Sequence, residues 1–112
     1  MITIHQIRLT DEGVRDFNRG MSIPSIEAKH KLMLNAGKNW KPEYWGFYTA
    51  CYEVDTDDLE RAFEVTNLWN TNSIVTALGQ RNASSSVGDI FERDGHFFIV
   101  DSFGFKEVEV SL

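Results

Sequence analysis

The dipeptide Asp94-Gly95 constrains the fold of this chain more than any other feature of the sequence. It separates two runs with high strand propensity, Ile90–Arg93 and His96–Asp101. An Asp-Gly pair between such runs favours a two-residue type I′ turn, because both turn positions require a positive φ. The sequence therefore predicts an antiparallel β-hairpin near the C-terminal end of the chain.

Hydrophobic spacing predicts the elements around this hairpin. Alternating apolar residues indicate strands, and apolar stripes behind a capping residue or a proline indicate helices. For the helix that begins at Pro24 we expect Gly37 to be the C-terminal cap. For the next helix, either Asp57 with Glu60 forms a capping box or Thr56 is the cap. We expect strands at residues 2–9, 47–54 and 105–110 and helices at residues 11–18, 24–37 and 57–67.

This order of elements predicts an α+β fold, with an antiparallel sheet and helices packed on one side. The 112 residues suffice for a single domain, residues 1–112, whose C-terminal β-hairpin unit spans about residues 84–110. Residues 68–86 have no clear periodicity, so we expect a long loop there. Gly104 is expected either to bend a continuous last strand or to separate it from the strand before it.

Composition and charge exclude several classes of protein. A formal net charge of -6 argues against non-specific binding to nucleic acid or to an anionic membrane. The chain lacks the run of about 20 apolar residues that a membrane helix needs, and its first residues do not resemble a secretory signal. We therefore expect a cytoplasmic protein that makes no membrane contact.

Cys51 is the only cysteine, which excludes an internal disulfide and a structural zinc site built on thiolates. On a predicted strand it is expected to be a small buried side chain. Glu53 and Asp55 follow closely in the sequence, and we expect their charges to raise the pKa of the thiol rather than activate it.

The acidic residues are concentrated in the second part of the chain. Residues 1–50 hold seven Lys or Arg and five Asp or Glu, whereas residues 51–112 hold four Lys or Arg and twelve Asp or Glu. A calcium loop starting at Asp55 is excluded, because its sixth position is Glu60 instead of glycine. Either these acids cap a helix and face water, or they form an acidic face for a basic partner. The candidate acids are Glu53, Asp55, Asp57, Asp58 and Glu60.

An aromatic run overlaps the end of the basic first part. Between Trp40 and Tyr52 lie two Trp, three Tyr and one Phe, with Lys38 and Lys41 beside them. Such rings form core and core edge, anchor protein interfaces, or stack on nucleic-acid bases. We favour protein anchoring by Trp40 and Trp45 over nucleic acid because of the net charge. A nucleic-acid-binding module at residues 38–48 is kept as the alternative.

No set of residues has the spacing of a catalytic or metal site. His5, His30 and His96 lack the spacing of metal ligands, and alternation along a strand places His96 and Asp101 on opposite faces. We therefore expect no enzymatic activity, no cofactor and no metal. A site that uses Asp89, His96 or Asp101 is the remaining enzymatic alternative.

The segment from Ser84-Ser85-Ser86-Val87-Gly88-Asp89 through the hairpin to Asp101-Ser102-Phe103-Gly104-Phe105 resembles the C-terminal motif of the YodL-like group, small proteins of phages and mobile elements. Residues Ala62–Asn67 are similar to a helix end found upstream in phage members. Six motif residues are expected to have structural roles in turns and bends: Gly88, Asp89, Asp94, Gly95, Asp101 and Gly104.

The resemblance implies a phage-type accessory protein. Short acidic phage proteins of this kind bind a host protein and inhibit or redirect it, for example as anti-defence or host-takeover factors. We therefore expect a non-enzymatic protein that modulates a host protein through an acidic and aromatic surface. An open strand edge in a sheet this small also makes a homodimer a candidate state.

Overall fold

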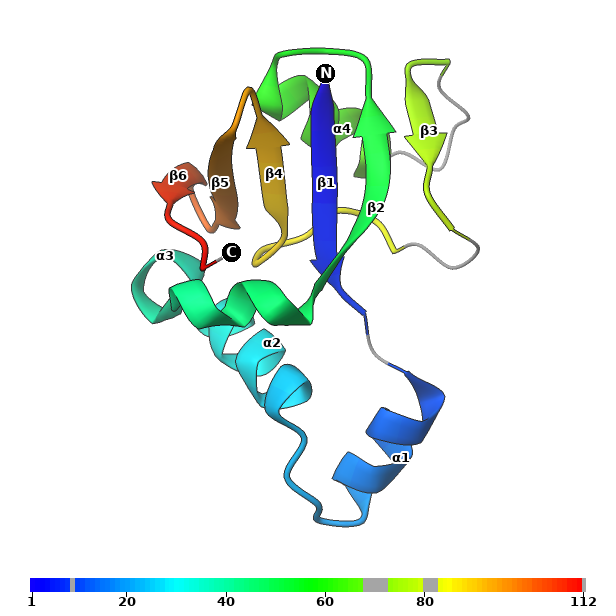
Figure 1. Ribbon diagram of the computed structural model, residues 1–112, viewed down its shortest axis with the longest axis vertical. Coiled ribbons are helices and arrows are strands. Elements are labelled where there is room, and N and C mark those ends of the chain that lie inside the picture. The colour runs from blue at the N-terminus through cyan, green and yellow to red at the C-terminus, as the bar shows by residue number, and fades with distance from the viewer. Residues whose placement is uncertain (9, 68–72, 80–82, 112) are drawn as a thin grey trace.

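The computed structural model describes residues 1–8, 10–67, 73–79 and 83–111. It confirms the α+β class, with one six-stranded sheet in the order β3-β2-β1-β4-β5-β6 (Figure 1). Every neighbouring pair in this sheet is antiparallel. The strands are β1 (Ile2–Ile7), β2 (Tyr48–Val54), β3 (Val75–Ala77), β4 (Ile90–Arg93), β5 (His96–Asp101) and β6 (Gly104–Val108).

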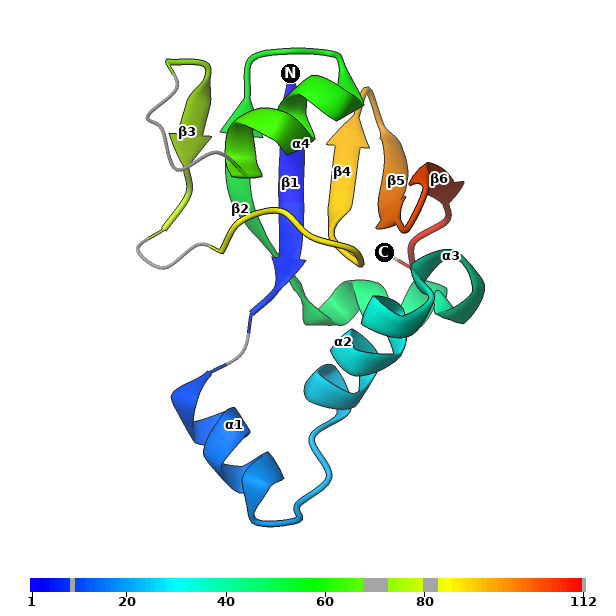
Figure 2. The ribbon, with the colours of Figure 1, turned by 180° about the vertical axis from the view of Figure 1, so that it is seen from behind.

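The helices occupy one face and one end of the sheet. Helix α4 (Leu59–Asn67) crosses one face, over β1 and its neighbours, as Figure 2 shows. The remaining helical elements gather at the lower end in Figure 1, and α1 projects furthest from the sheet. They are α1 (Asp11–Asn18), α2 (Pro24–Leu34), α3 (Ala36–Asn39) and the 3-10 helix η1 (Pro42–Phe47). No described helix is long and apolar enough to span a bilayer.

The predicted helix at residues 24–37 is wrong at its C-terminal end. Asn35 has an extended backbone (φ -161°, ψ 90°), which ends α2, and its side chain accepts a hydrogen bond from Lys38 N to begin α3. Gly37 therefore lies inside α3 and is not a cap. A Cβ at Gly37 would lie 2.3 Å from Asp101 Oδ2, so glycine allows α3 to approach the end of β5.

Both C-terminal turns follow from residues that take a positive φ. Asp94 (φ 52°) and Gly95 (φ 80°) form the turn between β4 and β5, which confirms the predicted hairpin. Gly104 (φ 102°) pairs with Asp101 across a second two-residue turn. The last strand is therefore a separate strand at the sheet edge, and not a bent continuation of β5.

Two hydrophobic clusters hold these elements together. The first lies between α4 and the sheet, where Ala62 and Val65 pack on Ile2, Ile4 and other residues of the central strands. The second joins α2, α3 and η1 to the lower part of the sheet through Leu32, Tyr44 and Ile90, among others. Burial of these side chains is the main stabilising contribution to the fold. One half of the sheet face opposite α4 is left without a helix (Figure 1).

Candidate functional site

Exposed acids from two distant segments meet at one end of the sheet. The loop from β2 to α4 and the turn from β4 to β5 flank the start of β1 at the top of Figure 1. The hydrogen bond with Asp57 raises the pKa of the N-terminal amine of Met1, and the charges of Asp57, Asp94 and Asp55 add to this shift. We call this region the acidic end and define it as Asp55, Asp57, Asp58, Glu60 and Asp94.

Two acids of this end have structural duties. Asp58 Oδ1 accepts hydrogen bonds from Glu60 N (3.0 Å) and Arg61 N (3.2 Å), so Asp58 caps α4. The expected cap was Asp57 or Thr56. Instead, Thr56 Oγ1 accepts a hydrogen bond from Asp58 N, and Asp57 Oδ1 lies 2.6 Å from the amine of Met1. That hydrogen bond and the positive charge lower the pKa of Asp57.

The other predicted acids are available to a partner. Glu53, Asp55 and Glu60 have no side-chain hydrogen bond or ion pair with any residue in the described ranges. The nearby arginines are already engaged. Arg61 contacts Glu64 (3.2 Å), and Arg93 lies over the Phe98 ring and donates to the carbonyl of Asp57. The acidic end therefore keeps an exposed negative charge.

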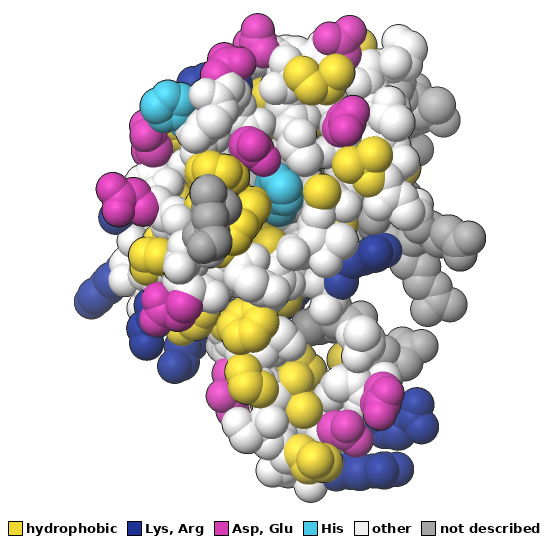
Figure 3. Space-filling model, viewed as in Figure 1, with side chains coloured by type: hydrophobic (Ala, Val, Ile, Leu, Met, Phe, Trp, Pro, Cys, Tyr) yellow, Lys and Arg dark blue, Asp and Glu magenta, His cyan; other side chains and the backbone are white. Residues whose placement is uncertain are grey.

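The sheet face opposite α4 continues this negative surface. Ile2, Ile4 and Val54 pack towards α4, so alternation along the strands turns Thr3 and Glu53 to the other face. In one row across this face, Thr3 lies between Glu53 on β2 and Glu92 on β4. Figure 3 views this side: acidic side chains are frequent over its upper part, whereas the lower end carries both acidic and basic side chains. We call the sheet face opposite α4 the open face.

One of the three histidines, for which the sequence predicted no role, lies on the open face. The pairing of β1 with β2 is irregular between Ile4 and His5, and His5 pairs with Ala50. His5 Nε2 is 2.9 Å from Glu92 Oε1, and its ring lies 4.6 Å from that of Trp45. His5 is only 9% exposed, and this burial lowers its pKa although Glu92 opposes the shift.

The structure does not bring Trp40 to the acidic end. The ring of Trp40 packs edge-on against Tyr44 and Tyr48, and its Nε1 donates to the carbonyl of Glu109. Trp45 borders the lower part of the open face, where it contacts His5 and Phe97. The acidic and aromatic residues that the sequence grouped into one surface thus lie in two regions, the acidic end and the aromatic cluster around Trp40. Trp45, at the border of the open face, connects the two.

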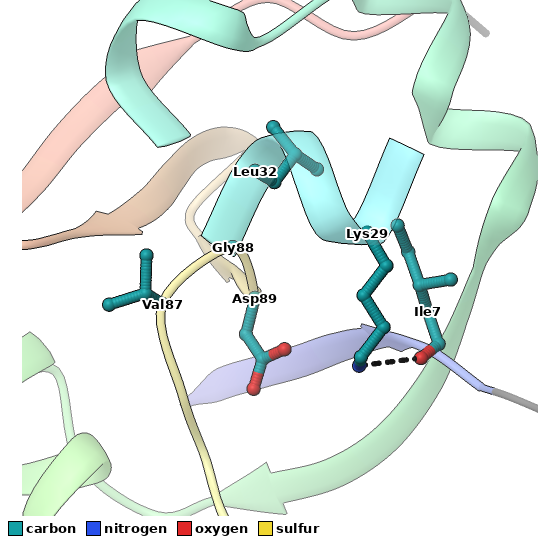
Figure 4. Close-up of a pocket in the computed structure, with 6 residues that line it drawn as sticks. All are labelled: Ile7, Lys29, Leu32, Val87, Gly88 and Asp89. Carbon is teal, nitrogen blue, oxygen red and sulfur yellow. Dashed lines mark hydrogen bonds between the residues drawn. The ribbon is translucent and has the colours of Figure 1, made fainter. Parts of the chain in front are cut away.

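The motif residues Gly88 and Asp89 belong to a segment that is held against the sheet from several directions. Gln6 Nε2 and Ser86 N each donate to Asp89 Oδ2 at 2.9 Å, and Tyr48 donates its hydroxyl proton to the carbonyl of Gly88. We call residues 83–89 the strap. Figure 4 shows Asp89 beside Gly88 and near Lys29, whose amine donates to the carbonyl of Ile7. The strap therefore has a structural role in the described fold.

Asp89 is buried, with 3% of its surface exposed. Burial raises its pKa to about 6, although the hydrogen bonds from Gln6 and Ser86 and the charge of Lys29 act in the opposite direction. Gln6 and Tyr48 were not predicted from the sequence, because only the assembled sheet brings them to the strap. The one available signal for Gln6 was that it is a polar residue within the apolar pattern of the first strand.

The structure separates the residues of the enzymatic alternative. His96 and Asp101 lie at opposite ends of β5, about 17 Å apart along an extended strand. Asp89 is enclosed by the strap, and His96 is exposed with Nδ1 3.2 Å from Glu107 Oε2. No cluster of His, Cys, Asp or Glu with metal-binding geometry occurs in the described part of the chain.

Cys51 takes the position that the sequence predicts. Cys51 is fully buried, and this burial is the main reason that its pKa is raised. Among the acids it is Asp89, and not the expected Glu53 or Asp55, whose charge adds to that shift. His30 is exposed on α2 and packs against the ring of Phe17.

No protein-family model, no curated protein and no solved structure matches this chain.

Proposed function

We propose that this chain is a non-enzymatic accessory protein that binds and modulates a host protein through its acidic end and open face. The observation that carries the proposal is the set of acids without partners at the acidic end and on the open face. Asp55 and Glu60 from one segment lie at the same end of the sheet as Asp94 from another. The phage setting is supported by the resemblance of residues 84–105.

The partner's matching surface is expected to be basic. Clustered charge of one sign speeds association with a surface of opposite sign and disfavours wrong partners. An exposed acid that caps a helix or binds the N-terminal amine, as Asp58 and Asp57 do, has a structural role. Glu53, Asp55 and Glu60 have no such duty among the described residues, and a protein surface gains no stability from keeping like charges together.

Two observations favour a protein partner over nucleic acid at residues 38–48. The rings of Tyr44 and Tyr48 both pack against Trp40, which leaves these rings less available for stacking on bases. The adjoining open face carries Glu53 and Glu92, which would repel phosphates. Lys38 and Lys41 are exposed, but the aromatic platform that single-strand binders place beside such lysines is largely packed inside the fold.

A pull-down from host lysate with a matched pair of variants tests this proposal. Glu53→Lys/Asp55→Lys reverses two acids that have no structural duty. Glu12→Lys/Glu43→Lys makes the same change in net charge at exposed positions on α1 and η1. We expect wild type and the control variant to retain the same partner at low salt and the first variant to lose it.

The retained partner should also dissociate as salt is raised, because exposed charges are screened. Retention of no protein by wild type, or equal retention by both variants, would contradict the proposed function.

A further inference from the structure

A groove runs beside α4 on the helix-bearing face of the sheet. Helix α4 covers β1 and its neighbours but not the β5–β6 hairpin (Figure 2). The space between them has a volume of about 300 Å³. Phe63 of α4, Val100 of β5 and Phe105 of β6 supply its apolar lining. The groove therefore exists because a helix of nine residues covers only part of a six-stranded sheet.

The apolar lining is held in place by ring contacts. Phe105 lies 5.2 Å from the ring of Phe91 and 6.4 Å from that of Phe63, with the second pair edge-to-face. Val100 and Phe91 are almost fully buried in the same cluster. Because these side chains are fixed by the core, the groove is preformed, and a ligand would not have to order it on binding.

A fully exposed aromatic side chain lies next to the groove residues along the chain. Phe103 lies in the turn between β5 and β6, between the groove residues Ser102 and Gly104. It is fully exposed, and it is the largest of the exposed apolar side chains on the described surface. A phenylalanine left in water at a turn contributes nothing to the fold, whereas aromatic side chains are frequent anchors in interfaces.

The charges around the groove are negative on both sides. Glu60 of α4 lines one side. On the other side, Val100 of β5 packs in the core under α4, and Phe98 lies two residues before it on the same face of the strand. Glu107 of β6 is the strand-pairing partner of Phe98, so the side chains of Phe98 and Glu107 also lie on the α4 face of the sheet. The basic groups in this area, Arg93 and His96, are already in contact with Phe98 and Glu107 respectively.

This charge identifies the kind of occupant. A second copy docked symmetrically on the groove would bring Glu60 and Glu107 of both copies into one interface, and like charges at an interface are costly. A segment that carries Lys or Arg would instead be attracted. Its apolar side chain would meet Phe63, Val100 and Phe105 in a volume suited to one large residue.

We propose that the groove binds a basic segment of the partner protein, with one large apolar side chain inserted between α4 and the β5–β6 hairpin and with Phe103 packed against its flank. This inference rests on the proposed function and adds a second, apolar contact to the acidic end. The charged residues of the segment would contact Glu60 and Glu107.

A labelled peptide tests the groove directly. The probe is a short peptide with one central Phe flanked by lysines, and its matched control has Ser in place of Phe. We expect the Phe peptide to shift the amide resonances of Ser102, Gly104 and Phe105, and the Ser peptide to bind at least about fivefold more weakly. Amide shifts confined to other regions, or equal binding of the two peptides, would overturn the inference.

Two variants separate the groove from the acidic end. Phe103→Ser changes a fully exposed side chain, so the fold should be unaffected, and we expect about a fivefold loss of affinity for the Phe peptide. Adding Glu60→Lys should lower the affinity for the Phe peptide a further two- to fivefold. Glu53→Lys/Asp55→Lys, which leaves the groove residues intact, should affect peptide binding less than Phe103→Ser does.

The same variants keep the two proposals apart. If the partner from lysate is lost with Glu53→Lys/Asp55→Lys but is retained equally by wild type and Phe103→Ser, the groove inference fails and the proposed function stands. If wild type retains no partner at all, the proposed function fails, and with it the inference that rests on it.

Discussion

The strap and the acidic end contain the same chemical group in opposite circumstances. Asp89 of the strap is buried and accepts hydrogen bonds from Gln6 and Ser86. Asp55 at the acidic end is exposed, and its side chain has no partner among the described residues. The difference shows that burial and hydrogen bonding separate a carboxylate that holds the fold from one that is free to contact another molecule.

The largest expected effect on this comparison comes from Asp89→Ala. The substitution leaves the buried donors of Gln6 and Ser86 without their acceptor, and each such donor costs about 1 to 3 kcal/mol. We expect the free energy of unfolding at pH 7 to fall by about 3 to 4 kcal/mol, measured by urea denaturation. Asp55→Ala is the matched control and should change it by less than about 0.5 kcal/mol.

The pH dependence of stability should also depend on Asp89. Its pKa rises from an ordinary 3.8 to about 6 on folding, so between these values the folded state binds more protons than the unfolded state. Stability due to this group is therefore greatest below about pH 4 and is lost as the pH rises through 6, by about 2 to 3 kcal/mol.

Subtracting the profile of Asp89→Asn from that of wild type isolates this contribution. The subtraction is needed because the lowered pKa of His5 acts with the opposite sign below its ordinary value of 6.5. A difference profile that is flat between pH 4 and 6.5 would show that Asp89 does not titrate in this way.

Gly88→Ala should destabilise the strap by about 2 kcal/mol. Gly88 has a φ of +96°, which is strained for alanine, and an added Cβ would lie 3.2 Å from Leu32 Cβ. Gly20→Ala provides the comparison, because Gly20 has a φ of +84° with no atom within 4 Å of the added Cβ. Gly20→Ala should lower the free energy of unfolding only through backbone strain, by about 1 kcal/mol, in the same denaturation experiment. Equal losses would mean that Leu32 moves aside at no cost.

The smallest expected effect is that of Glu53→Ala/Asp55→Ala on stability. Neither side chain has a partner that the substitution would leave unpaired. We expect a change in melting temperature within the range of ordinary surface substitutions, equivalent to about 0.5 kcal/mol or less. A larger loss would show that these acids stabilise the fold and would weaken the comparison with Asp89.

The local elements of this fold could be predicted from the sequence where one residue type determines the backbone. Asp94-Gly95 predicts the hairpin, and Pro24 marks the start of α2, where it is the first helical residue. Asn35 is different. The apolar stripe continues past it and hides the break, where Asn35 caps the N-terminus of α3. The close approach of α3 to β5 at Gly37 depends on tertiary packing, which no local pattern contains.

The candidate site was predicted only in part, for a related reason. The acids at residues 53–60 lie in one run of sequence, so their common exposure could be inferred. Asp94, Glu92 and His5 join them only because strand pairing brings β4 and β1 beside β2. The groove depends on the length of α4 relative to the width of the sheet, which follows from tertiary packing.

In the proposed function, Glu53 and Asp55 bind the partner, whereas Asp89 maintains the fold. The most direct test is calorimetric titration of the isolated partner with wild type, Glu53→Lys/Asp55→Lys and Asp89→Asn. We expect the charge reversal to weaken binding about tenfold or more with little change in melting temperature. Asp89→Asn should change the melting temperature and leave the affinity of the folded protein unaltered. Unchanged affinity for Glu53→Lys/Asp55→Lys, or loss of affinity confined to Asp89→Asn, would contradict the claim.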